Sequence, residues 1–331
     1  MANNILELKD VHIHFRSREG LVKAVRGIDM ALKPGEVIGL VGESGCGKSV
    51  TSLAIMGLLP KPHGFIAKGS ITFEGQNLTQ LSTMQMQSLR GNKLAMIFQE
   101  PMTALNPVLT IGEQIGEVLE VHQKLKLKSE ANRAACIRAL EMVSIPRATQ
   151  VLKEYPHQFS GGMRQRIMIA MALSCNPSIL IADEPTTALD VTIQAQILDL
   201  LREMKKQLNT AIIFITHDLG VINEMADRVM VMYAGQVVEE APVQELFRTP
   251  SHPYTRGLLK SRPGRMKRDE KLYCIPGTVP NSLQMPPGCP FGPRCEQYES
   301  TCSLSEPALR QVAANTEHLA NCLLLNAGGA R

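Results

Sequence analysis

The segment GESGCGKS, residues 42–49, combines residue types that can bind the phosphates of a nucleotide. It follows the apolar run EVIGLV and precedes VTSLAIMGLL, so it lies between a predicted strand and a predicted helix. Glycines let the backbone amides turn toward phosphate oxygens, and the helix start adds positive potential. A glycine-rich turn that matches by chance is the alternative, which the flanking elements disfavour. The candidate ATP-binding residues are Gly42, Glu43, Ser44, Gly45, Cys46, Gly47, Lys48, Ser49 and Val50.

Within this loop, Lys48 is expected to bind the β- and γ-phosphates, and Ser49 is expected to place its hydroxyl on Mg²⁺. Cys46 is not required by this chemistry, and filling space in the loop is its simplest role. Its position near the positive helix end predicts a lowered thiol pKa. Alkylation of Cys46 is therefore expected to block ATP binding, and ATP is expected to protect it.

An acidic pair ends the apolar run SILIADEP. Asp183 suits the coordination shell of Mg²⁺, and Glu184 suits a general base that orients the attacking water. The alternative is a solvated acidic turn, which is common after strands but less plausible in a chain that also carries a phosphate loop.

Two further polar residues follow predicted strands. His217 comes after AIIFIT and is predicted to hydrogen-bond a γ-phosphate at the same sheet edge as the acidic pair. Gln99 ends LAMIFQ and is predicted to contact both metal and water. The alternatives are a structural histidine and an ordinary polar residue at a strand end.

A second anion-binding helix start is predicted at FSGGMRQR. Ser160 is expected to be the helix N-cap, and Gly161 and Gly162 leave the first-turn amides uncovered. Because the chain already has one phosphate loop, this second site is expected to serve the nucleotide of another molecule. Two copies arranged head to tail would then enclose ATP between loop and helix start.

The string PPGCPFGPRCEQYESTC, near the C-terminus, contains clustered cysteines but little potential for regular structure. Eight cysteines in a reducing cytosol favour metal binding or chemistry over disulfides. Four thiolates can close around one metal centre and so order a segment that cannot bury a core. Chemistry alone allows a structural Cys₄ zinc site or an iron–sulfur cluster. Cys274 is a spare ligand, Cys136 and Cys175 are expected in the core, and the candidate ligands are Cys289, Cys295, Cys302 and Cys322.

The elements that must position these residues can be read from hydrophobic patterns. VHIHF, residues 11–15, alternates apolar and polar residues and predicts a half-buried antiparallel strand. EVIGLVG, SILIAD and AIIFIT are continuous apolar runs typical of parallel strands covered on both faces. Residues 112–155 have helical periodicity and predict a mostly helical insertion. Residues after 244 are richer in Pro, Gly and Cys, which places a domain boundary near residue 250.

Composition narrows the class of protein. The chain has 331 residues, which suits one large domain plus a smaller one, and its net charge of +4 is mild. Trp is absent and aromatic residues are scarce, so no nucleic-acid partner is expected. Neither a secretory signal nor an apolar run long enough to span a membrane is visible. The sequence therefore predicts a soluble, cytosolic protein.

Taken together and in this order, the phosphate loop, Gln99, SGGMRQR, ILIADEP, ALD (188–190) and His217 resemble the motif set of ABC-type ATPases. The resemblance covers about residues 4–245. It implies that Phe15 stacks on adenine, that Asp190 lies at a dimer seam, and that the signature residues Ser160, Gly161, Gly162 and Met163 complete the partner's nucleotide site. Met163 replaces the Gln usual in the family, which is expected to tune activity rather than abolish it.

The strings SHPYTRGLL, IPGTVPNSL and PPGCPFGPRC resemble the C-terminal extension of ATP-binding subunits from dipeptide, oligopeptide and nickel importers. The resemblance implies an α/β fold: a P-loop ATPase at 1–250 with a mainly parallel core sheet, an antiparallel β subdomain and a helical subdomain at about 105–170. Residues 251–331 would form a small Cys-rich extension, and the resemblance favours a [4Fe–4S] cluster over structural Zn²⁺.

The same resemblance implies a function and its partners. The chain would hydrolyse ATP with Mg²⁺ at the cytoplasmic face of the cell membrane and energise peptide import. Its partners would be a second, paralogous ABC ATPase subunit, two membrane permease subunits and, indirectly, an extracytoplasmic solute-binding protein. Alternatives are the same role for nickel or another small solute, an ABC ATPase acting on nucleic acid, and a regulatory subunit that only binds nucleotide.

Overall fold

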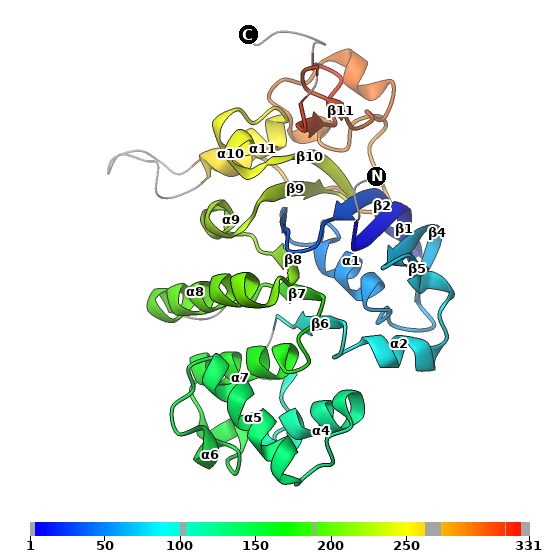
Figure 1. Ribbon diagram of the computed structural model, residues 1–331. Helices are drawn as coiled ribbons and strands as arrows, with labels where there is room; N and C mark the ends of the chain where they lie inside the picture. The colour runs from blue at the N-terminus through cyan, green and yellow to red at the C-terminus, as the bar shows by residue number, and fades with distance from the viewer. Residues whose placement is uncertain (1–3, 100–103, 188–189, 262–272, 315, 326–331) are drawn as a thin grey trace. The chain divides into compact units, whose positions relative to one another are not determined.

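The computed structural model describes residues 4–99, 104–187, 190–261, 273–314 and 316–325. The chain divides into two compact units. Unit 1 contains 1–32, 37–79 and 215–331, and unit 2 contains 33–36 and 80–214. Residues 251–331, which we call the C-terminal segment, thus belong to the same unit as residues 1–32. Figure 1 labels the elements.

Unit 1 contains an antiparallel sheet with the strand order β2-β1-β4-β5. The strand predicted at residues 11–15 lies within β1, where Val11 and Ile13 are buried and His12 and His14 are partly exposed, so this prediction is confirmed. The bounds are β1 Leu6–Ser17, β2 Gly20–Leu32, β4 Gly64–Phe73 and β5 Gln76–Asn77.

A second group of strands in unit 1 has the order β11-β12-β10-β9-β3. Strand β3 pairs with β9 in parallel, whereas β10 pairs with β9 and with β12 in antiparallel fashion. All five residues of β3 are buried, as its continuous apolar run predicts. The bounds are β3 Val37–Val41, β9 Arg228–Tyr233, β10 Gln236–Pro242, β11 Arg310–Gln311 and β12 Leu319–Ala320.

The helices of unit 1 are short. Helix α1 follows the phosphate loop directly, and α11 begins with Pro at its first position, where a missing amide hydrogen costs nothing. The α-helices are α1 Lys48–Ile55, α9 Leu219–Met225, α10 Val243–Arg248 and α11 Pro253–Lys260. The 3₁₀ helices are η1 Leu78–Gln80, η4 Gly292–Arg294 and η5 Ser300–Ser303.

Unit 2 contributes three adjacent strands in the order β8-β7-β6, and β6 pairs with β7 in parallel. Every residue of these strands is buried, in keeping with their apolar runs. The parallel pairings within both units, the antiparallel sheet and the helical part confirm the α/β fold class predicted from the sequence. The bounds are β6 Leu94–Ile97, β7 Ile179–Asp183 and β8 Ala211–Ile215.

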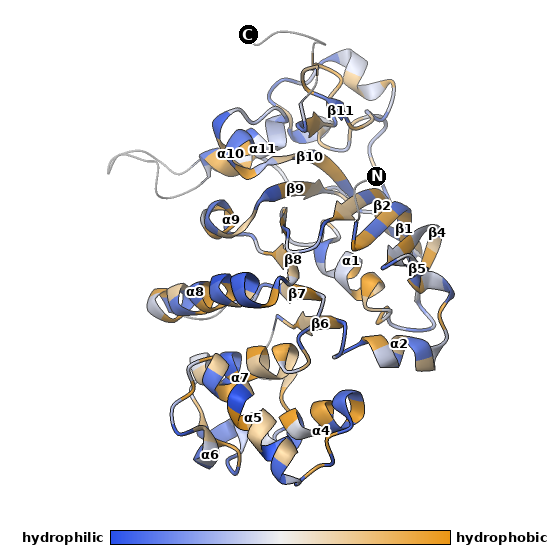
Figure 2. Cartoon of the chain, in the orientation of Figure 1, coloured by the Kyte–Doolittle hydropathy of each residue, from blue (hydrophilic) through white to orange (hydrophobic). Residues whose placement is uncertain are grey.

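The rest of unit 2 is helical, as predicted for residues 112–155. Side-chain caps fix several helix starts: Thr110 and Glu113 form a capping box, and Ser129 accepts a hydrogen bond from an amide of its helix. Hydrophilic and hydrophobic residues are interspersed along α8 in Figure 2. Its buried residues include Ile197, Leu201 and Met204, whose helical spacing places them on one face. The helices are α2 Thr83–Leu89, α4 Ile111–Gln123, α5 Glu130–Met142, α6 Ala148–Val151, η2 Pro156–Gln158, α7 Gly161–Leu173 and α8 Val191–Leu208.

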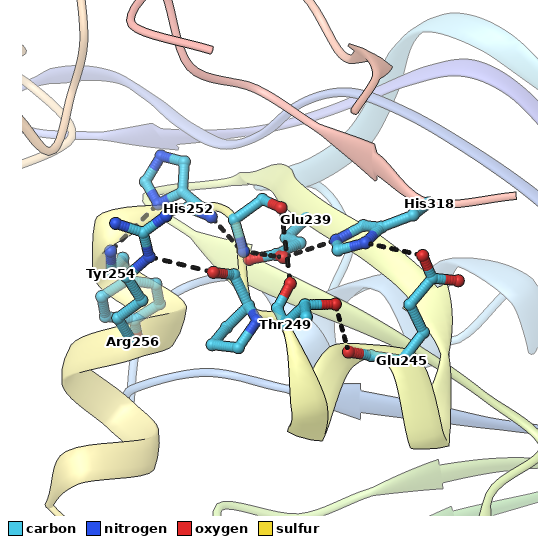
Figure 3. A network of polar contacts seen from close by, with 9 residues as sticks. Glu239, Glu245, Thr249, His252, Tyr254, Arg256 and His318 are labelled. Carbon is cyan, nitrogen blue, oxygen red and sulfur yellow. Dashed lines mark hydrogen bonds and ion pairs between the residues drawn. The ribbon is translucent and has the colours of Figure 1, made fainter. Parts of the chain in front are cut away.

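A buried polar network joins the C-terminal segment to β10 (Figure 3). Glu239 is 0% exposed, and its carboxylate accepts hydrogen bonds from the backbone amides of Ser251 (2.6 Å) and His252 (2.9 Å). His318 lies 2.7 Å from Glu239 through Nε2 and 3.4 Å from Glu245 through Nδ1. A carboxylate buried this deeply is tolerated only because each of these partners compensates it.

The network makes stability depend on pH. Burial alone lowers the pKa of His318, but the hydrogen bond and ion pair with Glu239, aided by Glu245, outweigh it and raise the pKa above its ordinary value. The folded protein therefore holds this proton more tightly than the unfolded chain. This stabilisation is fully present below the ordinary pKa of about 6.5 and is lost as pH rises through the folded pKa.

We therefore expect the free energy of unfolding to fall more steeply above pH 6.5 in the wild type than in His318→Gln. Burial lowers the pKa of His252 to about 4, so that residue is neutral in this range and does not mask the effect. Urea titrations at several pH values measure the difference. His63→Gln, at an exposed histidine, is the matched control. Parallel pH profiles for wild type and His318→Gln would contradict the assignment.

Candidate functional site

The segment between β3 and α1 has the backbone geometry of a phosphate cradle. Gly42 and Gly47 have φ values of 150° and 106°, and a Cβ would lie 2.2 Å from the Met232 carbonyl oxygen at Gly42 and 2.9 Å from the Ala24 carbonyl oxygen at Gly47. No larger residue fits at either position. At Gly45, where φ is 78°, a Cβ would meet no atom of the described residues within 4 Å. The loop is thus fixed by close backbone contacts at both ends and open in the middle, which fits a triphosphate.

Lys48 is 6% exposed, and its side chain packs against the loop that precedes it. Its ammonium donates hydrogen bonds to the carbonyl oxygens of Gly42 (2.8 Å) and Glu43 (3.0 Å). Ser49 and Val50 follow in the first turn of α1, whose N-cap, Gly47, provides no side-chain cap. The amides of this turn are therefore not covered by a capping side chain, which suits an anion.

The predicted lowering of the Cys46 pKa is wrong, whereas the predicted effect of Cys46 alkylation on ATP binding stays a prediction. Its side chain is 0% exposed, and burial raises the pKa of the thiol despite the opposing effect of the nearby Lys48 ammonium, 3.6 Å from Sγ. The sequence suggested proximity to positive charge but gave no sign that the thiol would be removed from water. Cys46 thus fills space beneath the loop, in agreement with the simpler of its two predicted roles.

His217 lies two residues after β8 and lines a pocket in unit 1 of ≈ 340 Å³. Gly42 and Glu43 line the same pocket, so the structure brings His217 to the beginning of the phosphate loop. Phe15 lies in β1 opposite Gly64, where a Cβ would come within 2.7 Å of the Phe15 ring. That glycine leaves room for the aromatic ring.

The acidic pair and Gln99 belong to unit 2. Asp183 is the last residue of β7 and is 3% exposed, and Glu184 follows with φ 47°. Gln99 Nε2 donates to the Glu184 carboxylate at 3.1 Å, as does the Thr187 hydroxyl at 2.8 Å. The structure therefore brings Gln99 and Glu184 together. Thr187 was not predicted as a site residue, although it stands three positions after Glu184 in a sequence stretch that the resemblance covers.

Ser160 is the N-cap of α7, as predicted, and its hydroxyl accepts a hydrogen bond from the Met163 amide at 3.4 Å. A Cβ at Gly161 would meet nothing within 4 Å, so that face of the helix start is open within the described residues. At Gly162 a Cβ would lie 2.7 Å from Ile193 Cγ2, so glycine is required for packing against α8. Asp190 caps α8 by accepting from the Ile193 amide at 2.9 Å, a structural role that the sequence analysis did not assign.

Part of one predicted motif falls outside the described residues, namely Ala188 and Leu189 of ALD. In α7, Gln165 is 2% exposed and donates to the Pro185 carbonyl oxygen at 2.6 Å. This hydrogen bond links the helix that starts at Ser160 to the turn that follows Glu184.

The four candidate metal-binding cysteines lie in one part of unit 1. The Cys289 amide donates to the Cys302 carbonyl oxygen at 2.8 Å. Burial raises the pKa of Cys289 and Cys295, and the charges of the other candidate thiols raise both further. As placed, however, the described residues contain no group of three or more His, Cys, Asp or Glu side chains that could hold a metal ion.

The C-terminal segment also contacts the phosphate loop, which the sequence analysis did not predict. Arg294 forms an ion pair with Glu43, and the hydroxyl of Tyr254 accepts a hydrogen bond from the Glu43 amide. Both residues stand in strings that the resemblance covered, PRC and SHPYTRGLL, but nothing in their spacing indicated which loop they would reach.

Comparison with known proteins shows the family to which the chain is similar. Residues 25–187 match the family model "ABC transporter", and residues 238–302 match "Oligopeptide/dipeptide transporter, C-terminal region". The chain is 51% identical to the oligopeptide transport ATP-binding protein AppD of Bacillus subtilis, over 99% of both chains. It is 50% identical to the dipeptide transport ATP-binding protein DppD of the same organism, over 97% of this chain and 94% of that one.

A solved structure shows the same fold. The ATP-binding cassette MJ0796, described as dimeric and bound to ADP and Pi in a post-hydrolysis state, matches with a TM-score of 0.65 and 27% identity, covering 72% of this chain and 98% of its own. Among the helices of the described ranges, none combines the length and apolar character needed to cross a bilayer.

Proposed function

This chain belongs to the family of ABC transporter ATP-binding proteins, and we propose that it hydrolyses ATP to energise import of di- or oligopeptides through separate membrane permease subunits. The observation that carries the proposal is sequence identity of 51% and 50%, over nearly the full length, to an oligopeptide and a dipeptide transport ATP-binding protein. The match of residues 238–302 to the C-terminal region of oligopeptide and dipeptide transporters adds to it. The phosphate cradle between β3 and α1 supports the nucleotide part of the proposal.

In the proposed mechanism, the loop amides and the Lys48 ammonium bind the phosphates of ATP. Ser49, Asp183 and Gln99 would hold Mg²⁺, which would supply positive charge to the phosphate oxygens. Glu184 accepts the proton of the attacking water, and the Gln99 amide holds its carboxylate in place. His217 donates a hydrogen bond to the γ-phosphate, and Phe15 stacks on the adenine.

We further propose that two ATPase subunits close head to tail around the nucleotides. The uncovered amides beginning at Gly161, with Ser160, Gly162 and Met163, would contact the nucleotide bound to the partner subunit, and Asp190 would lie at the seam. The dimeric state of the similar ATP-binding cassette supports this arrangement. The partner is expected to be a paralogous ATPase, and the assembly would lie at the cytoplasmic face of the membrane against two permeases served by a solute-binding protein.

Peptide uptake tests the function. In cells lacking this chain, uptake of a labelled tripeptide should be lost, and the wild-type chain should restore it. Lys48→Ala should not restore uptake, because removing the ammonium removes charge compensation at the phosphates. Lys126→Ala, at an exposed lysine of unit 2, is the control and should restore uptake. Normal peptide uptake without the chain, or loss of nickel uptake in its place, would overturn the substrate assignment.

We also propose that Cys289, Cys295, Cys302 and Cys322 hold a [4Fe–4S] cluster. The clustering of these thiols near the C-terminus and the resemblance of the surrounding strings to peptide-importer subunits support this proposal, and a structural Zn²⁺ is the alternative for the same thiolates. Anaerobically purified protein should contain about four iron and four sulfide per chain, and Cys302→Ser should lower both. Cys175→Ser, outside the segment, should not. One zinc per chain without sulfide would replace the cluster by a zinc site.

A further inference from the structure

Glu43, the second residue of the phosphate loop, is held at both its side chain and its backbone by the C-terminal segment. Arg294 donates two hydrogen bonds to the Glu43 carboxylate, from Nη1 at 2.9 Å and from Nη2 at 3.2 Å. The amide of Glu43 donates to the hydroxyl of Tyr254 at 2.9 Å. A paired contact of this kind fixes orientation as well as position, because the planar guanidinium matches the carboxylate.

Arg294 is itself rigidly held. Its side chain is 6% exposed, and Nε donates to the Pro276 carbonyl oxygen at 2.8 Å. The guanidinium lies 5.7 Å from the centre of the Tyr233 ring and 6.0 Å from that of Phe291. The rings of Tyr233, Tyr254 and Phe291 pack against one another with centre distances of 4.7 to 5.4 Å. A guanidinium seated in such an aromatic cluster loses little further freedom when it binds Glu43.

The position of Glu43 matters for nucleotide binding in two ways. Its carbonyl oxygen is one of the two that accept hydrogen bonds from the Lys48 ammonium, so a displaced Glu43 also displaces the lysine. Its carboxylate stands on the same loop as the phosphate-binding amides, where an uncompensated negative charge repels a triphosphate. Arg294 offsets that charge with a buried positive one.

We infer that Arg294 is a positioning residue of the ATP site, which acts from the C-terminal segment by neutralising and orienting Glu43. The inference rests on the proposed ATPase function and extends it. Through Arg294, which precedes Cys295 in the sequence, the C-terminal segment would directly influence the affinity of the loop for nucleotide. The prediction is a change in binding of Mg–ATP rather than in the chemical step.

The experiment measures binding of a fluorescent ATP analogue with Mg²⁺ to the purified full-length chain. Arg294→Met should raise the Kd roughly tenfold, and Arg294→Lys, which keeps the charge but not the paired geometry, should raise it less. Combining Glu43→Gln with Arg294→Met should restore most of the affinity, because no charge is then left uncompensated. The KM for ATP should follow the Kd, and kcat should stay within about twofold.

The matched control is Glu306→Gln, which removes a different ion pair between the C-terminal segment and the N-terminal strands, that of Glu306 with Arg26. It should leave the Kd unchanged. An unchanged Kd in Arg294→Met, or no recovery in the double variant, would overturn the inference. If Arg294→Met does not fold, Arg294→Lys decides it, and an unchanged Kd in that variant would overturn the inference. Failure of the wild type to bind the analogue would instead overturn the proposed function.

Discussion

Replacing Glu184 by Gln is expected to lower ATP turnover by at least about a hundredfold, the usual contribution of a general base, while ATP binding stays near the wild-type level. Gln99 and Thr187 both donate hydrogen bonds to the Glu184 carboxylate. The amide oxygen of Gln can still accept from these two donors, so the local structure should survive. What is lost is the ability to take a proton from water.

Turnover is measured by phosphate release and binding by fluorescence of an ATP analogue. Glu203→Gln, at an exposed position of the same unit, controls for the loss of one negative charge and should leave both values unchanged. Turnover close to that of the wild type in Glu184→Gln would assign the base to another residue. Loss of binding would show that the carboxylate supports the nucleotide site as a whole.

Replacing Ser160 by Arg is expected to abolish ATP-driven association of two ATPase subunits and to reduce turnover by about a hundredfold or more, while leaving ATP binding by the single subunit intact. At the helix start after Ser160, a Cβ at Gly161 would meet no neighbouring atom of the described part of the chain within 4 Å. A long cationic side chain would therefore fill the space in which the partner's nucleotide is proposed to bind. Sedimentation with and without ATP measures the association.

The matched control is Ser129→Arg. Ser129 caps α5 as Ser160 caps α7, accepting from the Asn132 amide at 3.2 Å, so the control removes an equivalent cap at a helix start outside the signature. Each substitution should cost about 1 kcal/mol of stability through the lost cap. Only Ser160→Arg should affect association. Equal behaviour of the two variants would reduce the role of Ser160 to capping.

Much of the fold follows from local patterns in the sequence. The buried runs at β3, β7 and β8 and the alternation within β1 are fixed by which side chains must leave water, and a single sequence displays them directly. The helix start at Ser160 was equally legible, because capping depends on neighbours three residues away. These strands and this helix start, which depend on residues close together in the sequence, were therefore predicted correctly.

Contacts between distant segments were not predictable in this way. Arg294 and Glu43 are 251 residues apart in the sequence, and neither residue type is unusual in its local context. Likewise, the positive surroundings of Cys46 were visible in the sequence, but its burial depends on the packing of several strands and the opposite pKa shift resulted. The sequence shows which groups are present, whereas the tertiary structure decides how much water reaches them.

The deeply enclosed carboxylate of Glu239 limits how this protein can evolve. Its partners are supplied by Ser251, His252 and His318, all later in the chain. A chain shortened before these residues would leave the acid buried without its partners, at a large loss of stability. Chimeras that exchange tails between distant ABC proteins should respect the same pairing.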